Sequence, residues 1–197
     1  MRTYLLAAAL GCAAFPALAD QPFPATLVGH AILPAESFIP APADAPEDLK
    51  SAGKYTTGKR VDALGSVMGK SFERDTGVKL PFPGQPLQGH SGIKRMADGS
   101  YWVLNDNGSG SKANSPDSML YLNRWNIDFA TGTWKHLETI FLHDPDKKVP
   151  FRIVHEGTAK RYLTGSDFDT EGFQWINDTL WIGDEFGPYL LKADRAC

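Results

Sequence analysis

The sequence predicts an all-β fold, in the form of a partial β-propeller. From about residue 60 onward, short runs of β-branched and aromatic residues alternate with Gly, Asn and Asp turns, and no segment of helical length shows a sustained helical apolar period. One motif recurs after roughly eighty residues, with two long strands between its copies, and four antiparallel strands per repeat are typical of a propeller blade. A β-sandwich in which two hairpins resemble each other by chance is the alternative.

Residues 1–19 predict a secretory signal peptide. Arg2 precedes an apolar core, and Ala17-Leu18-Ala19 forms a small-x-small cleavage site. The apolar run is well short of the roughly 20 residues that a membrane span needs, which disfavours a transmembrane anchor. A lipoprotein signal ending at Cys12 is a further alternative, but the leucine expected shortly before the cysteine is displaced by one position. We therefore expect a periplasmic or secreted protein with no transmembrane segment after cleavage.

The composition is that of a mildly acidic protein. The chain carries 20 Lys and Arg against 23 Asp and Glu, a formal net charge of −3. The basic residues are dispersed and form no cluster along a helix or groove, so we expect no nucleic-acid partner. Only Cys197 would remain after signal cleavage, which excludes an intramolecular disulfide in the mature chain. No feature of the sequence indicates an oligomeric state.

Residues 20–59 are expected to form a Pro- and Ala-rich amino-terminal segment with one strand. The stretch "PATLVGHAIL" (24–33) is the only one there with the composition of a strand. The stretch "PAPADAPEDLK" (40–50) predicts a surface linker that leads at most into a short helical turn.

Residues 60–197 are expected to form the propeller domain. The predicted strands are 92–96, 101–105, 119–127, 134–142, 171–176, 180–184 and 189–193. The segment 143–167 follows the fourth of these strands as an insertion, which explains the length of the repeat. The sequence thus contains one whole blade and three strands of the next, whereas a closed propeller has at least four blades. We therefore expect a fragment that is incomplete at its carboxyl end, with open strand edges and little activity alone.

The two copies of the repeated motif predict two matching hairpins. They are "HSGIKRMADGSYWVLNDNG" (90–108) and "TEGFQWINDTLWIGDEFG" (170–187). Asn177-Asp178 predicts a two-residue turn in the second hairpin, and the first requires a three-residue loop, 97–99. Continued along the strands, these turns place Glu171 opposite Asp184 and Ser91 opposite Asn105.

The same hairpins place polar side chains at one end, which we term the mouth. Because the first strand of a hairpin begins where the second ends, acids from both strands meet there. Facing carboxylates are unfavourable without a bound cation, a shared proton or a nearby base. We predict metal ligands in the second hairpin and substrate or mouth residues in the first: Asp169, Glu171, Asp184 and Glu185, and His90, Ser91, Asn105 and Asp106, respectively.

Ca²⁺ is the cation that this oxygen-rich set predicts, because it accepts six to eight oxygen ligands in irregular geometry. Zinc is disfavoured since the mature chain has no cysteine except at its end, and His90 is the one imidazole near the mouth. The alternative is structural: the carboxylates accept hydrogen bonds from backbone amides of a neighbouring loop. For Asn105 and Asp106 the alternative is that "NDNGSGSK" (105–112) forms a flexible turn.

Two apparent catalytic motifs do not fit their patterns. The glycines of residues 108–112 lack the spacing of a phosphate-binding loop, and no helix follows them. "GHSG" (89–92) is only partly a nucleophile elbow, since Ile93 stands where the second glycine belongs. No catalytic residue is therefore predicted.

The chain resembles a family of exported bacterial proteins, the phytase-like family with esterase-like activity of phytase. The resemblance rests on "GHSGIKRMADGSYWVLNDNG", "LYLNRWNIDF" and "DFDTEGFQWINDTLWIGDEFGPYLLKAD", and it covers roughly residues 60–197, the amino-terminal half of such a protein. It implies a β-propeller fold, export, and hydrolysis of phosphate or carboxyl esters. Fold alone does not fix function.

Two functions from different classes follow. The first is an exported, cation-dependent hydrolase of small-molecule phosphate or carboxyl esters; a lactone-hydrolysing propeller is close to it in chemistry. The second is a non-catalytic propeller that uses the mouth to bind a ligand or partner in the cell envelope.

Overall fold

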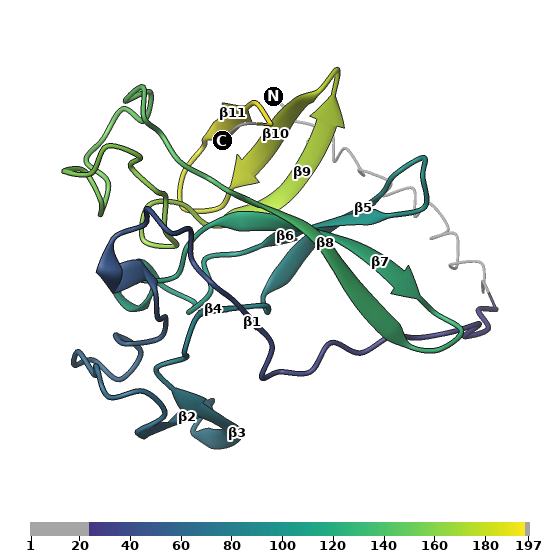
Figure 1. The fold of residues 1–197 in the computed structure, drawn as a ribbon, viewed down its shortest axis with the longest axis horizontal. Coiled ribbons are helices and arrows are strands. Elements are labelled where there is room, and N and C mark those ends of the chain that lie inside the picture. Colours follow the sequence, from purple (N-terminus) through teal and green to yellow (C-terminus); the bar gives the residue numbers. More distant parts are fainter. Residues whose placement is uncertain (1–23, 196–197) are drawn as a thin grey trace, which may run out of the picture.

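The computed structural model describes residues 24–195, so the predicted signal peptide, Cys12 and Cys197 lie outside the described residues. Within residues 24–195 the fold is all-β, as predicted, with eleven strands in four small antiparallel sheets and two short 3-10 helices (Figure 1). In this part of the chain no helix has the length and apolarity needed to cross a bilayer.

The strands form one large sheet, one smaller sheet and two short pairs. The large sheet has the order β5-β6-β7-β8, the smaller one β11-β10-β9, and the pairs are β2-β3 and β1-β4. The bounds are β1 Phe38–Ile39, β2 Val67–Ser71, β3 Arg74–Leu80, β4 Gln85–Pro86, β5 His90–Arg95, β6 Tyr101–Asn105, β7 Tyr121–Asp128, β8 Thr133–Phe141, β9 Thr170–Ile176, β10 Thr179–Asp184 and β11 Leu190–Ala193; the 3-10 helices are Glu47–Leu49 and Lys112–Asn114.

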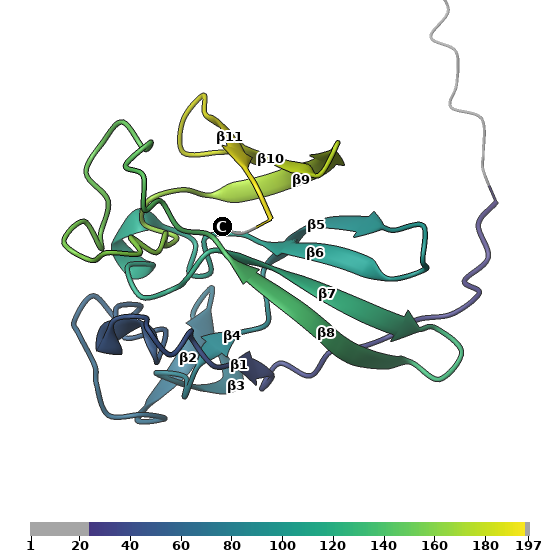
Figure 2. The same cartoon turned by 45° about the horizontal axis from the view of Figure 1, so that its top comes forward.

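The two larger sheets correspond to the two copies of the repeat. Strands β5, β6 and β7 match β9, β10 and β11, and β5 packs beside β9 where the two sheets meet (Figure 2). Lys94 Nζ on β5 donates to Gln174 Oε1 on β9 at 2.5 Å, which joins corresponding positions of the two copies. The arrangement is consistent with the predicted partial propeller.

Both predicted turns are confirmed. Asn177 and Asp178 have φ of 49° and 60°, the pair of positive values that a type I′ hairpin turn requires. In the first hairpin the Met96 N–H donates to the Ser100 carbonyl at 2.8 Å, which closes a three-residue loop, and Gly99 there has φ of 86°.

The predicted register at the mouth is wrong in both hairpins, for the same reason. Asp184 pairs with Thr170 rather than with Glu171, and Asn105 pairs with His90 rather than with Ser91. Each first strand carries a β-bulge, and the extra residue is Glu171 in β9 and Ser91 in β5. A bulge inserts one residue against the partner strand, so a register that is continued from the turn fails beyond it. The bulges occupy equivalent positions of the repeat, which supports the match between the hairpins.

The amino-terminal segment differs from the prediction. Residues 24–33 form no strand. The stretch begins with Pro24 and is followed by Pro34, and Leu27 and Val28 are 80% and 98% exposed. The short helical turn exists at Glu47–Leu49, but the linker continues into packed structure, with Leu49 and Ala52 fully buried.

The hairpin β2–β3 was not predicted. Its strands are mostly exposed and lack a run of alternating apolar residues, and its turn is made by Phe72 and Glu73 at positive φ. Such turns usually carry Asn and Gly, so the sequence contains no turn signal there.

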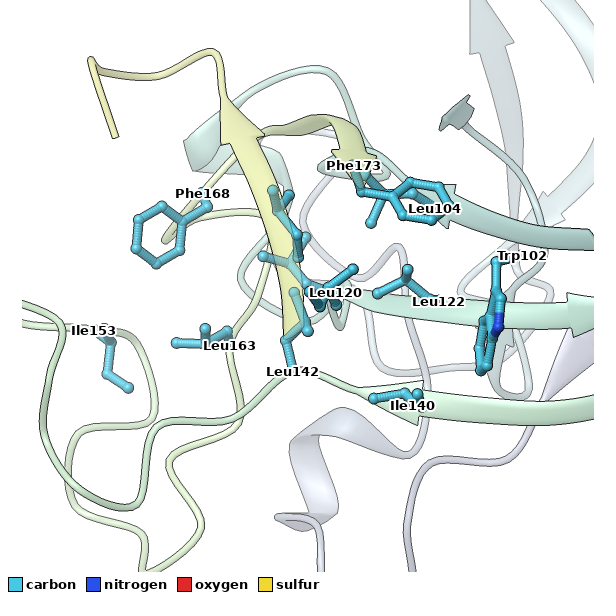
Figure 3. Packing of buried hydrophobic residues seen from close by; sticks show 12 residues of the cluster. Trp102, Leu104, Leu120, Leu122, Ile140, Leu142, Ile153, Leu163, Phe168 and Phe173 are labelled. Carbon is cyan, nitrogen blue, oxygen red and sulfur yellow. The ribbon is translucent and has the colours of Figure 1, made fainter. Parts of the chain in front are cut away.

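The large sheet is buried on both faces. Trp102 and Leu104 face the smaller sheet, where they join Phe173 of β9 in a core that also includes residues of the insertion (Figure 3). Val103, between them in the chain, faces the amino-terminal segment and packs in a second core with Ile39 and Leu49. The indole of Trp102 lies 5.8 Å from that of Trp175 on β9, so Trp102 packs between the two larger sheets.

Residues 143–167 form the predicted insertion, which contains isolated bridges but no strand. It folds around Arg161, which is 2% exposed. The guanidinium lies 3.1 Å from Asp144 Oδ2 and 2.5 Å from Glu156 Oε1. Asp167 accepts the N–H groups of Val154 and Thr164, so its carboxylate stabilises this loop and is not part of the mouth.

Candidate functional site

The mouth is shaped by the two bulges. Ser91 and Glu171 are the extra residues at the starts of β5 and β9, which pack side by side. Bulges commonly redirect a side chain next to a functional site. The hydroxyl of Ser91 interacts with the Glu171 carboxylate and favours its ionised form. The two copies of the repeat thus bring one hydroxyl and one carboxylate together from different sheets.

Three carboxylates converge at the mouth, and we term them the acid cluster: Asp169, Glu171 and Glu185. One oxygen of each lies within 4.8 Å of those of the other two. Asp169 immediately precedes β9, Glu171 is its bulge residue, and Glu185 follows the end of β10. Asp169 is buried whereas both glutamates are exposed, so the cluster has a fixed base and a solvent-facing rim.

Asp169 is held rigidly by hydrogen bonds. Its Oδ1 accepts the backbone N–H of Asn107 at 3.2 Å, and its Oδ2 accepts Asn107 Nδ2 at 2.6 Å. Its own carbonyl accepts the N–H of Glu185 at 2.9 Å. Asn107 belongs to the loop after β6, so one blade orients a carboxylate of the next.

Asp184 is not one of the three carboxylates of the acid cluster and has a structural role beside it. Its Oδ1 accepts the backbone N–H of Asp169 at 2.7 Å, which fixes the chain where it enters β9. This is the backbone-amide role that the sequence left open as the alternative. Asp184 Oδ2 is buried and has no hydrogen-bond partner among the described residues. Asp184 therefore positions Asp169.

The electrostatics of the mouth disfavour ionisation of three of its carboxylates, Asp169, Glu171 and Asp106. Burial is the main cause that raises the pKa of Asp169, and the nearby Glu185 and Asp184 charges raise it further, against the hydrogen bonds from Asn107. Partial desolvation of its carboxylate by neighbouring atoms also raises the pKa of Glu171, although the residue as a whole is exposed, and the Asp169 charge is next in importance. The pKa of Asp106 is raised by burial and, more weakly, by Asp169. A cation at the cluster would relieve all three.

Some of the predicted residues of the first hairpin border the mouth, and others are buried beneath it. Asp106 lies against Gly89 and accepts the N–H of Gly108 at 2.7 Å, and its charge acts on Glu171. Asn105 is 3% exposed, and its Nδ2 donates to the Gln88 carbonyl and to the Tyr121 hydroxyl. Asn105 thus supports the mouth from below.

His90 pairs with Asn105 at the beginning of β5 and borders the mouth. Burial lowers the pKa of its imidazole, so the neutral form is favoured. His90 is not among the three groups that the structure brings within ligand distance of one another.

Two functional neighbours were missed by the sequence reasoning. Asn107 orients Asp169, and Thr170 Oγ1 donates to the Asn105 carbonyl at 2.6 Å, tying the entry of β9 to the end of β6. Both are adjacent in sequence to predicted site residues. Their roles depend on hydrogen bonds between the two sheets, which the sequence does not reveal. Gly165 packs so closely on the Asn107 carbonyl that a Cβ would overlap it.

The acid cluster has the donor chemistry of a hard-cation site. Carboxylate oxygens are the ligands that Ca²⁺ and Mg²⁺ accept, and Ca²⁺ tolerates the irregular arrangement that unrelated strand ends produce. Asp169, Glu171 and Glu185 could supply three ligands, leaving other positions for water or a substrate oxygen.

The comparisons with known proteins identify the family. The family model described as "Phytase-like: Esterase-like activity of phytase" matches residues 85–196, which is more than half of the chain and includes both hairpins and the acid cluster. No curated protein and no solved structure matches the chain. The chain therefore belongs to the phytase-like family.

Proposed function

We propose that the chain supplies the cation-holding part of a hydrolase that acts on small-molecule phosphate or carboxyl esters. The observation that carries the proposal is the convergence of Asp169, Glu171 and Glu185 from separate strand ends to within 4.8 Å. The family description, esterase-like activity of phytase, supports ester hydrolysis as the reaction class. Ca²⁺ is the cation that we propose.

The residues divide the work of the site. Asp169 is preorganised by Asn107 and by Asp184, and preorganised ligands bind a cation with little reorganisation. Glu171 and Glu185 reach the same point from the exposed rim, where a substrate can approach. A bound divalent cation would polarise the phosphoryl or carbonyl oxygen and lower the pKa of a water molecule.

The test is hydrolysis of 4-nitrophenyl acetate and 4-nitrophenyl phosphate by the purified protein, in EDTA and then in Ca²⁺. The test is how the rate of hydrolysis depends on the cation. It should rise with Ca²⁺ and fall at least roughly tenfold in Glu171→Gln, the scale of one lost charged contact. Glu36→Gln, an exposed glutamate of the amino-terminal segment, is the matched control.

Hydrolysis that is equal in EDTA and Ca²⁺, or equal in Glu171→Gln and Glu36→Gln, would contradict the proposal. Cation binding with no hydrolysis of either ester would favour the second function, a propeller that binds a ligand at the cell envelope. Export is proposed from residues 1–19, and amino-terminal sequencing of the protein from a periplasmic extract tests it: cleavage after Ala19 is expected.

A further inference from the structure

A cavity of about 700 Å³ lies between the hairpin β2–β3 and the loop that follows β6. Residues of β2 and β3 line one wall of this cavity, which we term the hairpin cleft. Figure 1 shows this hairpin apart from the two larger sheets. Clefts of this volume are of the size that holds small organic molecules. None of the residues of the acid cluster lines it.

The tip of the hairpin is unusual. Phe72 and Glu73 form the turn at φ of 47° and 63°, values that favour Asn or Gly and are uncommon for a bulky aromatic residue. Phe72 is 92% exposed, and its side chain lines the cleft. A strained, exposed aromatic residue at the rim of a cavity is a reason to look for a function.

The walls of the cleft are suited to an uncharged ligand. Its apolar lining comes mainly from β2, β3 and the residues after them, including Met68, Val78 and Leu80. Among residues 24–195, Lys70 and Glu73 are the charged residues that line it, and they have opposite signs, so the cleft selects neither an anion nor a cation. Uncharged polar residues are distributed among them, including Thr76 of β3, Gln88 and Asn114.

The cleft adjoins the residues that border the mouth. Gly108 lines the cleft, and its N–H donates to Asp106 Oδ1 at 2.7 Å. Gln88 lines it as well, and its carbonyl accepts Asn105 Nδ2. Part of the cleft wall is therefore bonded directly to Asp106 and Asn105, which border and support the mouth.

We propose that the hairpin cleft binds the uncharged apolar or aromatic group of the ester substrate, with Phe72 packing against it. The inference rests on the proposed function, in which the acid cluster and its cation act on the ester oxygens. It narrows the substrate class to esters that carry such a group and disfavours small, highly hydrophilic phosphate esters.

The test measures binding of 2-naphthol, a neutral aromatic alcohol, to the full chain in EDTA by fluorescence titration. Phe72→Asn is the informative variant, because Asn suits positive φ and removes the apolar ring without disturbing the turn. We expect saturable binding by the wild type and roughly tenfold weaker binding by Phe72→Asn, the scale of one buried apolar side chain. Thermal unfolding of the variant should be unchanged or shifted upward.

Leu64→Asn is the matched control, since Leu64 is an exposed loop residue outside the cleft. Absence of saturable binding by the wild type, or equal weakening in Phe72→Asn and Leu64→Asn, would overturn the inference. Because the titration is made in EDTA, it also separates the two proposals. If the protein binds naphthol but shows no cation-dependent hydrolysis, the proposed ligand site in the cleft is supported and only the proposed function is contradicted.

Discussion

Replacing Asn107 by alanine should weaken folding and cation binding together. The side chain is 3% exposed, and its Nδ2 donates to Asp169 Oδ2 at 2.6 Å. Its Oδ1 accepts the N–H groups of Ser109 at 3.2 Å and Gly110 at 2.8 Å. Alanine retains the backbone N–H bond to Asp169 and removes these three.

The magnitude follows from the character of each bond. A hydrogen bond to a charged group contributes about 1.5–3 kcal/mol, and the two turn bonds, which water can partly replace, about 0.5 kcal/mol each. The free energy of unfolding in EDTA should therefore fall by about 2.5–4 kcal/mol. Ca²⁺ at about a hundred times its Kd should stabilise the wild type by about 2.7 kcal/mol. Asn107→Ala should gain less, because its Asp169 carboxylate is no longer held in position.

The assay is urea unfolding followed by tryptophan fluorescence, in EDTA and in saturating Ca²⁺. Asn126→Ala is the control, since Asn126 is an exposed asparagine of β7. A loss of stability no larger in Asn107→Ala than in the control would refute the reasoning. Equal stabilisation of Asn107→Ala and the wild type by Ca²⁺ would refute the claim that Asn107 positions Asp169 for cation binding.

Three further predictions concern packing, pH and the turn. Gly165→Ala should destabilise by roughly 1–3 kcal/mol in urea unfolding, because its Cβ would overlap the Asn107 carbonyl. The pKa of Glu171 is raised in the folded protein, so in EDTA the folded state binds this proton more tightly than the unfolded state does. The ionised carboxylate therefore lowers the free energy of unfolding at neutral pH. This cost decreases once the pH falls below the raised pKa and is gone below the pKa of the unfolded state. The stability difference between wild type and Glu171→Gln should therefore shrink on acidification, and Ca²⁺ affinity should fall over the same range; a difference that does not change with pH would contradict the shift. Asp178→Gly should raise the free energy of unfolding by roughly 0.5–1 kcal/mol, because Asp178 has φ of 60°, which glycine adopts without strain; a lower free energy of unfolding would count against the assigned turn.

Local signals in the sequence were enough for the strands and turns of the two hairpins. Asn177-Asp178 specifies a tight turn by itself, and apolar residues on either side specify the strands that it joins. The long strands β7 and β8 followed from their length and composition. These features depend on neighbours in the chain, which is why they could be predicted.

The details of the mouth depend on contacts that the sequence does not reveal. The bulges at Ser91 and Glu171 form where two sheets meet, and no turn residue marks them. Asp184 and Glu185 are adjacent acids, yet one accepts a buried backbone N–H and the other reaches the rim. Their roles are set by the position of Asp169, which is fixed from the other blade.

The amino-terminal errors have the same origin. Residues 24–33 have the composition of a strand, but a strand needs a partner, and none lies beside them within residues 24–195. The hairpin β2–β3 is the opposite case: its strands are paired, although its sequence is largely polar and its turn carries no recognisable signal. Composition predicts strands only where a partner is available.

Isothermal titration of Ca²⁺ into the full chain at neutral pH tests the central claim most directly. If Asp169, Glu171 and Glu185 form one cation site, the wild type should bind one ion per chain, and Glu171→Gln and Glu185→Gln should each bind at least roughly tenfold more weakly. Glu36→Gln should bind as the wild type does. No saturable binding by the wild type, or binding that both cluster variants retain in full, would contradict the assignment of the acid cluster as a metal site.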